Sequence, residues 1–62
     1  MKTTELDYYG TKVKCVYVDY RDNEGAYTLE LLNVLVDNTS IEGLLSENIW
    51  DELQQEIYNK LV

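Results

Sequence analysis

The chain has 62 residues, one cysteine, no histidine, and twelve acidic against five basic side chains, which gives a net charge of −7. A chain of this length forms a single domain, residues 1–62, whose core alone supplies only ~3–5 kcal/mol. One cysteine excludes an internal disulfide, and a zinc site would lack its preferred ligands, so oligomerisation is the support that remains. The negative charge disfavours direct binding to nucleic acid or to anionic membranes. Two readings of it stay open: it attracts a basic surface on another protein, or it only keeps a small domain soluble.

The first two strands are predicted at about residues 3–9 and 12–22. Gly10 suits the first central position of a two-residue type II′ turn with Thr11 at the second. This pairing would set Asp7 opposite Lys14, a favourable cross-strand pair. It would also place four side chains on one face of the sheet: Leu6, Tyr8, Val13 and Cys15.

A third strand is predicted at about residues 26–36, after a three-residue loop that ends at Gly25. Its alternation continues the face of Val13 and Cys15 as far as Leu31 and then slips by one residue. A bulge at Leu32-Asn33 would return the following valines to the same face.

The period changes after the third strand, and the last element is predicted to be a helix at about residues 47–61. A short turn through Ile41 should dock Leu44 and Leu45 on the sheet, and Ser46 is a good N-cap. The helix repeats apolar residues at i, i+4 spacing: Ile49, Leu53, Ile57 and Leu61. The predicted fold is therefore α+β, a three-stranded antiparallel meander with one C-terminal helix packed on one face.

The second strand is apolar on both of its sides, whereas one helix covers only one side of a sheet. If the helix covers Val13, Cys15 and Tyr17, the other face exposes six side chains: Tyr9, Val16, Val18, Tyr20, Leu32 and Leu35. If it covers the opposite side, the two sets exchange roles. A contiguous apolar patch usually marks an interface, so these residues are the candidate surface for a partner or for a second copy of the chain.

The sequence gives little basis for catalysis. Without histidine there is no neutral-pH general base and nothing to activate Cys15, which we interpret as a core residue. The acidic stretch over residues 19–25 lacks calcium-loop spacing, and we interpret it as a solvated turn. We therefore expect a non-enzymatic protein without metal or cofactor. We also expect no membrane span and no signal peptide, and the single cysteine fits a reducing cytoplasm.

Most of the chain resembles small uncharacterised accessory proteins of bacteriophages and prophages. The resemblance rests on a hairpin, YGTKVKCVYVDY, and on a strand, a polar turn, an Ile-x-x-Leu-Leu-Ser element and an acidic helix, LELLNVLVDNTSIEGLLSENIWDELQQEIYNKL. It implies an accessory protein that acts in the host cytoplasm and transfers no catalytic residue.

Two functions are compatible with these features. The first is a small acidic binder that inhibits a host or antiviral-defence protein. In one version it mimics nucleic acid with a row of helix carboxylates: Glu47, Asp51, Glu52 and Glu56. The alternative is a homo-oligomeric structural or regulatory component of a phage assembly.

Overall fold

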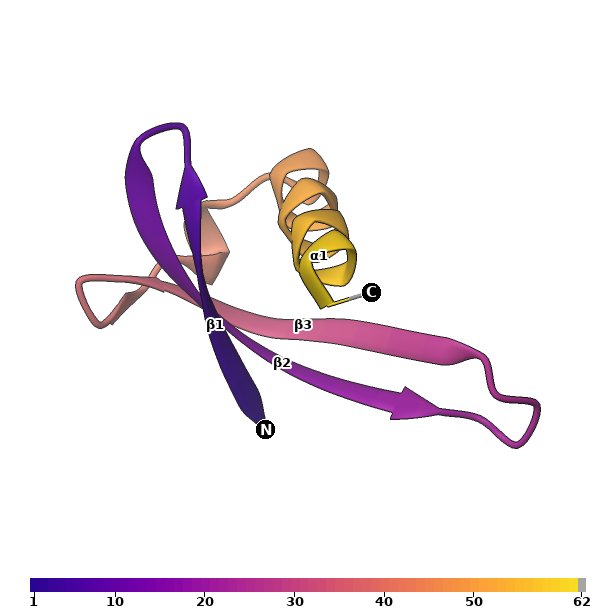
Figure 1. Cartoon of the computed structure of the whole chain (residues 1–62). Coiled ribbons are helices and arrows are strands. Elements are labelled where there is room, and N and C mark those ends of the chain that lie inside the picture. The colour runs from indigo at the N-terminus through magenta and orange to yellow at the C-terminus, as the bar shows by residue number, and fades with distance from the viewer. Residues whose placement is uncertain (62) are drawn as a thin grey trace.

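A computed structural model describes residues 1–61 and shows an antiparallel sheet with one helix packed over one face (Figure 1). The elements in chain order are β1 Lys2–Tyr8, β2 Thr11–Arg21, β3 Tyr27–Val36, β4 Thr39–Ser40, the short 3₁₀ helix η1 Glu42–Leu44, and α1 Glu47–Leu61. The strand order is β1-β2-β3-β4. The α+β class and the C-terminal helix are confirmed.

The sheet has four strands where the sequence predicted three. Asp37 and Asn38 both adopt positive φ, 51° and 66°, which Asp and Asn tolerate better than other non-glycine residues. This tight turn folds Thr39 and Ser40 back on the end of β3 as the two-residue strand β4. The backbone then enters η1 and the helix.

The first hairpin turns at Tyr9 and Gly10, so the predicted Gly10-Thr11 turn is wrong. Their φ values are 49° and 85°, and positive φ at both central positions is what a type I′ turn requires. The pairing moves by two residues as a result, and Leu6 lies opposite Val13. Because side chains alternate with a period of two, this shift leaves each strand residue on its predicted face.

The second hairpin and its bulge form as predicted. Tyr17 pairs with Leu31 and Cys15 pairs with Val34, so β3 has one residue more than β2 between these pairs. The register shift falls at Leu32, inside the predicted bulge. The bulge returns Val34 to the face that α1 covers, where it is fully buried.

Asn33 stabilises this bulge through its side-chain oxygen. Oδ1 accepts hydrogen bonds from the Val34 N–H at 2.8 Å and from the Ser40 hydroxyl at 2.7 Å. Since a buried donor without a partner costs about 1–3 kcal/mol, we expect Asn33→Ala to lower the free energy of unfolding by that order. Urea denaturation measures the change, and Asn48→Ala on the exposed start of α1 is the matched control. Equal midpoints for the two variants would contradict this role for Asn33.

The core lies between α1 and the face of β2 and β3 that carries Val13, Cys15 and Tyr17, the first of the two arrangements that the sequence left open. Within residues 1–61, eight side chains are buried: Val13, Cys15, Tyr17, Leu29, Leu31, Val34, Leu53 and Ile57. Leu45 packs against them as predicted, but Leu44 is 84% exposed, so its predicted docking on the sheet is wrong. Ile41 and Leu45 flank the 3₁₀ turn and point to the core, whereas Leu44 at its end points to solvent.

Two polar side chains of α1 hold the helix across the sheet. The Gln54 Oε1 accepts a hydrogen bond from the Leu31 N–H of β3 at 3.0 Å. The Lys60 Nζ donates to the Thr4 hydroxyl at 3.1 Å and to the Glu5 carbonyl at 3.0 Å, both on β1. Because β1 and β3 flank β2, the helix is fixed on both sides of the central strand.

Candidate protein-binding surface

The open face of the sheet, which points away from α1, carries an apolar strip. Alternation along β2 places three members of this strip on the side opposite to the buried residues, and β3 adds two more. Tyr20 is 56% exposed and Leu32 is 36% exposed, whereas the other members are half-buried. The apolar strip consists of Val16, Val18, Tyr20, Leu32 and Leu35. These are five of the six residues that the sequence placed on this face.

Tyr9, the sixth residue, does not belong to the open face. It lies in the turn, 84% exposed, and its hydroxyl donates to the Glu52 Oε1 of α1 at 3.4 Å. Its ring stands edge-on to Tyr8, with 4.6 Å between the ring centroids. The assignment was wrong because the hairpin turns one residue earlier than predicted, which removes Tyr9 from the strand.

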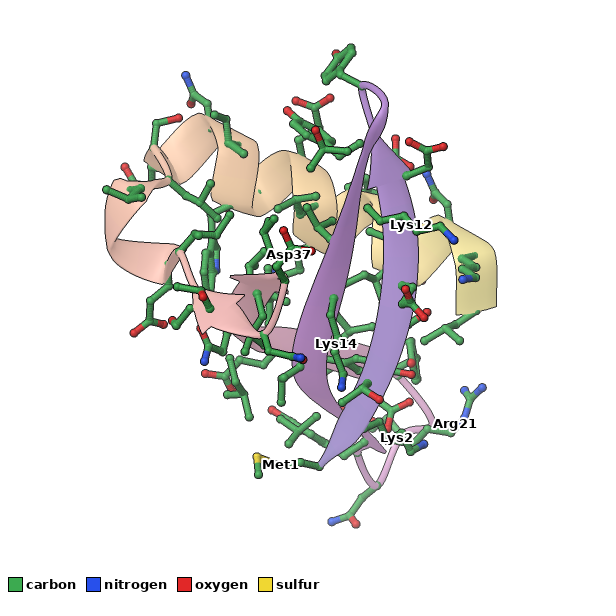
Figure 2. The ribbon with its side chains drawn as sticks, turned by 90° about the vertical axis from the view of Figure 1, so that its left-hand side faces the viewer. Met1, Lys2, Lys12, Lys14, Arg21 and Asp37 are labelled. Carbon is green, nitrogen blue, oxygen red and sulfur yellow. The ribbon has the colours of Figure 1, made fainter. Side chains whose placement is uncertain are left out.

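A charged region lies beside the apolar strip on the same face. Glu5 pairs with Lys14, and Asp7 pairs with Lys12, across β1 and β2. Figure 2 shows both lysines along this hairpin and Asp37 on the neighbouring turn. The two lysines and Asp37 line a hollow of about 330 Å³, and Leu35 of the apolar strip lines it as well. The sequence predicted one charge pair in this region, Asp7 with Lys14, and the shift of the hairpin replaces it with two pairs.

The four helix carboxylates do not form one face. Glu47 and Glu56 are separated by about two and a half turns at 3.6 residues per turn, so they lie on opposite sides of α1. Glu52 accepts a hydrogen bond from the Tyr8 hydroxyl at 3.0 Å, which directs it toward the first hairpin. Glu47 with Asp51 and Glu52 with Glu56 therefore form two separate pairs. This arrangement does not provide the single row of charges that phosphate mimicry on this helix requires.

A polar cluster lies near the turn of the β2–β3 hairpin, on the side of the sheet that α1 covers. Lys2 forms an ion pair with Asp19 at 2.9 Å, and the Tyr27 hydroxyl donates to the other Asp19 oxygen at 2.7 Å. The Arg21 guanidinium stands 5.4 Å from the centroid of the Tyr27 ring. The hydrogen bond from Lys2, followed by that from Tyr27, lowers the pKa of Asp19. The hydrogen bond to Asp19 raises the pKa of Tyr27 to about 12.

These two pKa shifts predict that the protein loses stability both at strongly acidic and at strongly alkaline pH. Asp19 has a lowered pKa, so its contribution is present above the unfolded value of about 3.9 and is lost as the pH falls through its folded pKa. Tyr27 has a raised pKa, so its contribution is present below about 10 and is lost as the pH rises through about 12. Burial also raises the pKa of Tyr8, so the test uses a Tyr8→Phe background. In that background an alkaline absorbance titration should show a late phenolate step that Tyr27→Phe removes. A late step that survives Tyr27→Phe would contradict the assignment.

The cysteine and the acidic turn that the sequence singled out both contribute to the fold. Cys15 is fully buried, and burial raises the pKa of its thiol. Asp22 accepts hydrogen bonds from the backbone N–H groups of Glu24 and Ala26 and so organises the predicted polar turn. Within residues 1–61 no three metal-ligating side chains gather. In the same range no helix has the length and apolarity needed to cross a membrane.

Comparisons with protein-family models, with curated proteins and with solved structures give no match for this chain. The resemblance to phage accessory proteins therefore stays a prediction.

Proposed function

We propose that this chain is a non-enzymatic protein-binding module and that its open sheet face docks on another protein. The observation that carries this proposal is the apolar strip on the face opposite α1, with Tyr20 and Leu32 its most exposed members. The neighbouring charge pairs of β1 and β2 would form a polar rim that orients the partner. Tyrosine suits such a surface because its ring is apolar and its hydroxyl remains able to bind.

The cellular setting belongs to the same proposal. The resemblance to phage accessory proteins favours a partner in the host cytoplasm, namely a host or antiviral-defence protein that the module inhibits. The net charge of −7 favours a partner with a basic surface over direct contact with nucleic acid.

A second candidate function is a homo-oligomeric component of a phage assembly, with the open face pairing with its own copy. The favouring observation is that this face has Glu5 and Asp7 on β1 beside Lys12 and Lys14 on β2. A two-fold axis that runs between these strands would set the acids of one copy against the lysines of the other.

Val18→Lys tests both candidates. Val18 lies opposite Glu30 on β3, so the introduced lysine gains a favourable cross-strand pair and the fold should persist. Leu44→Lys, at a residue 84% exposed and away from the open face, is the matched control. Circular dichroism verifies folding of both variants before binding is compared.

Sedimentation over a concentration series then separates the candidates. If the wild type self-associates, Val18→Lys should dissociate it and Leu44→Lys should not. If the wild type is a monomer, a partner captured from host lysate should be lost with Val18→Lys and retained with Leu44→Lys. Association or capture that is unchanged by Val18→Lys would overturn the open face as the docking surface.

A further inference from the structure

A second uncovered apolar surface lies on the helix side of the sheet, between the first hairpin and the start of α1. This groove has a volume of about 280 Å³. Its lining combines side chains from the hairpin tip, the end of β3, the η1 region and the helix, among them Tyr8, Tyr9, Val36, Ile41, Leu45 and Ile49. It is separate from the apolar strip because the sheet lies between them.

The groove exists because the helix closes the core at only one end. Leu53 and Ile57 are 1% and 0% exposed, whereas Ile49, one turn earlier, is half-buried. Ile41 and Leu45 are also half-buried although they pack against the core cluster. The apolar side chains at this end therefore retain exposed area that a partner would cover.

The rim of the groove is acidic. Glu42 and Glu47 line an adjoining hollow together with Leu45, which the two depressions share, and with Trp50. Glu52 stands at the hairpin side, held by the hydroxyls of Tyr8 and Tyr9. None of the residues that line the groove or the hollow is basic.

Lys60, the one basic side chain of α1, lies far from this rim. It is bound to Thr4 and to the Glu5 carbonyl, at the other end of the helix. The local charge at the groove is therefore negative without compensation from the helix.

We propose that this groove binds a basic amphipathic segment of another protein. Apolar side chains of that segment would enter the groove, and its lysines or arginines would meet Glu42 and Glu47. A second copy of this chain is a poor occupant, because its one amphipathic helix carries four carboxylates and a single lysine. This inference concerns a different surface from the open face and stands independently of it.

The probe is a synthetic amphipathic helical peptide of leucine and lysine without tryptophan. Trp50 is the only tryptophan of the chain and lies beside the groove, so its fluorescence reports binding. We expect a saturable change that weakens with added salt, and no change with a leucine–glutamate peptide. The double variant Glu42→Lys/Glu47→Lys should weaken binding by about tenfold or more.

The matched control is Glu24→Lys/Glu30→Lys, which makes the same charge change at exposed positions outside the groove, the hollow and the helix. It should weaken binding clearly less than the groove variant. Val18→Lys should bind the peptide like the wild type, so failure of the open-face proposal and failure of this one are distinguishable.

Three results would overturn the inference. The first is the absence of a saturable Trp50 signal at low salt. The second is equal weakening by the two double variants, which would indicate attraction to net charge alone. The third is equal binding of the leucine–lysine and the leucine–glutamate peptides, which would show that the charge of the rim does not select the occupant.

Discussion

Leu53→Ala is expected to remove most of the stability of this protein. The Leu53 side chain is 1% exposed and lies in the core between α1 and the sheet. Truncating a buried leucine to alanine costs about 2–5 kcal/mol, because transfer free energy is lost and a cavity remains. A domain of this size has only ~3–5 kcal/mol in total. Urea denaturation followed by far-UV circular dichroism should show a strongly lowered midpoint or a variant that is already unfolded in buffer.

Leu44→Ala and Leu61→Ala make the same chemical change at graded exposure. Leu44 is 84% exposed, so its truncation should change stability by no more than about 0.5 kcal/mol. Leu61, at the end of the same helix as Leu53, is 45% exposed and should fall between the two. The expected order of destabilisation is Leu53, then Leu61, then Leu44. A loss at Leu44 as large as that at Leu53 would mean that the described core is not what holds the fold together.

The sequence predicted those elements in which the spacing of apolar residues follows from the geometry of the helix or strand. The i, i+4 repeat and Ser46 located α1, and the Ser46 hydroxyl does accept a hydrogen bond from the Ile49 N–H at 3.3 Å. The change of parity after Leu31 located the bulge, because only an extra residue returns Val34 to the core face. In both cases the buried positions require apolar residues at a regular spacing, and that spacing is visible in the sequence.

The features that the sequence did not predict do not change the spacing of apolar residues. A two-residue slip of the first hairpin is invisible to alternation, since every residue that stays in a strand keeps its face. Gly10 was compatible with two turns, and only the positive φ of Tyr9 distinguishes them. The strand β4 is two residues long and depends on the backbone conformation of Asp37 and Asn38, so no hydrophobic period announces it.

The candidate surfaces divide in the same way. The apolar strip followed from alternation along β2, and Val16 and Val18 lie where that alternation put them. The groove combines the hairpin tip, β3, the η1 region and α1, four segments that only the tertiary fold brings together. The prediction of one acidic helix face was wrong, because nine residues at 100° per residue place Glu47 and Glu56 on opposite sides of α1.

Cys15 offers a second prediction with a large effect, because alkylation of its thiol requires the fold to open. The side chain is 0% exposed, and burial raises its pKa, so little thiolate is available in the folded state. With a stability of ~3–5 kcal/mol and a tenfold change per 1.4 kcal/mol, iodoacetamide should react about 10²- to 10⁴-fold more slowly than with the urea-unfolded chain. Leu53→Ala should lose most of this protection.

An internal reference sharpens the Cys15 experiment. Leu44→Cys introduces an exposed thiol into the same chain, and peptide mass spectrometry follows both sites in one reaction. Comparable rates at the two sites would contradict the buried position of Cys15. The protection also reports on association, because a partner that binds only the folded state increases it by mass action. Protection that grows with protein concentration in the wild type, but not in Val18→Lys, would point to a second copy on the open face. Protection that is independent of concentration in the wild type and in Val18→Lys would favour another protein as the partner of the open face.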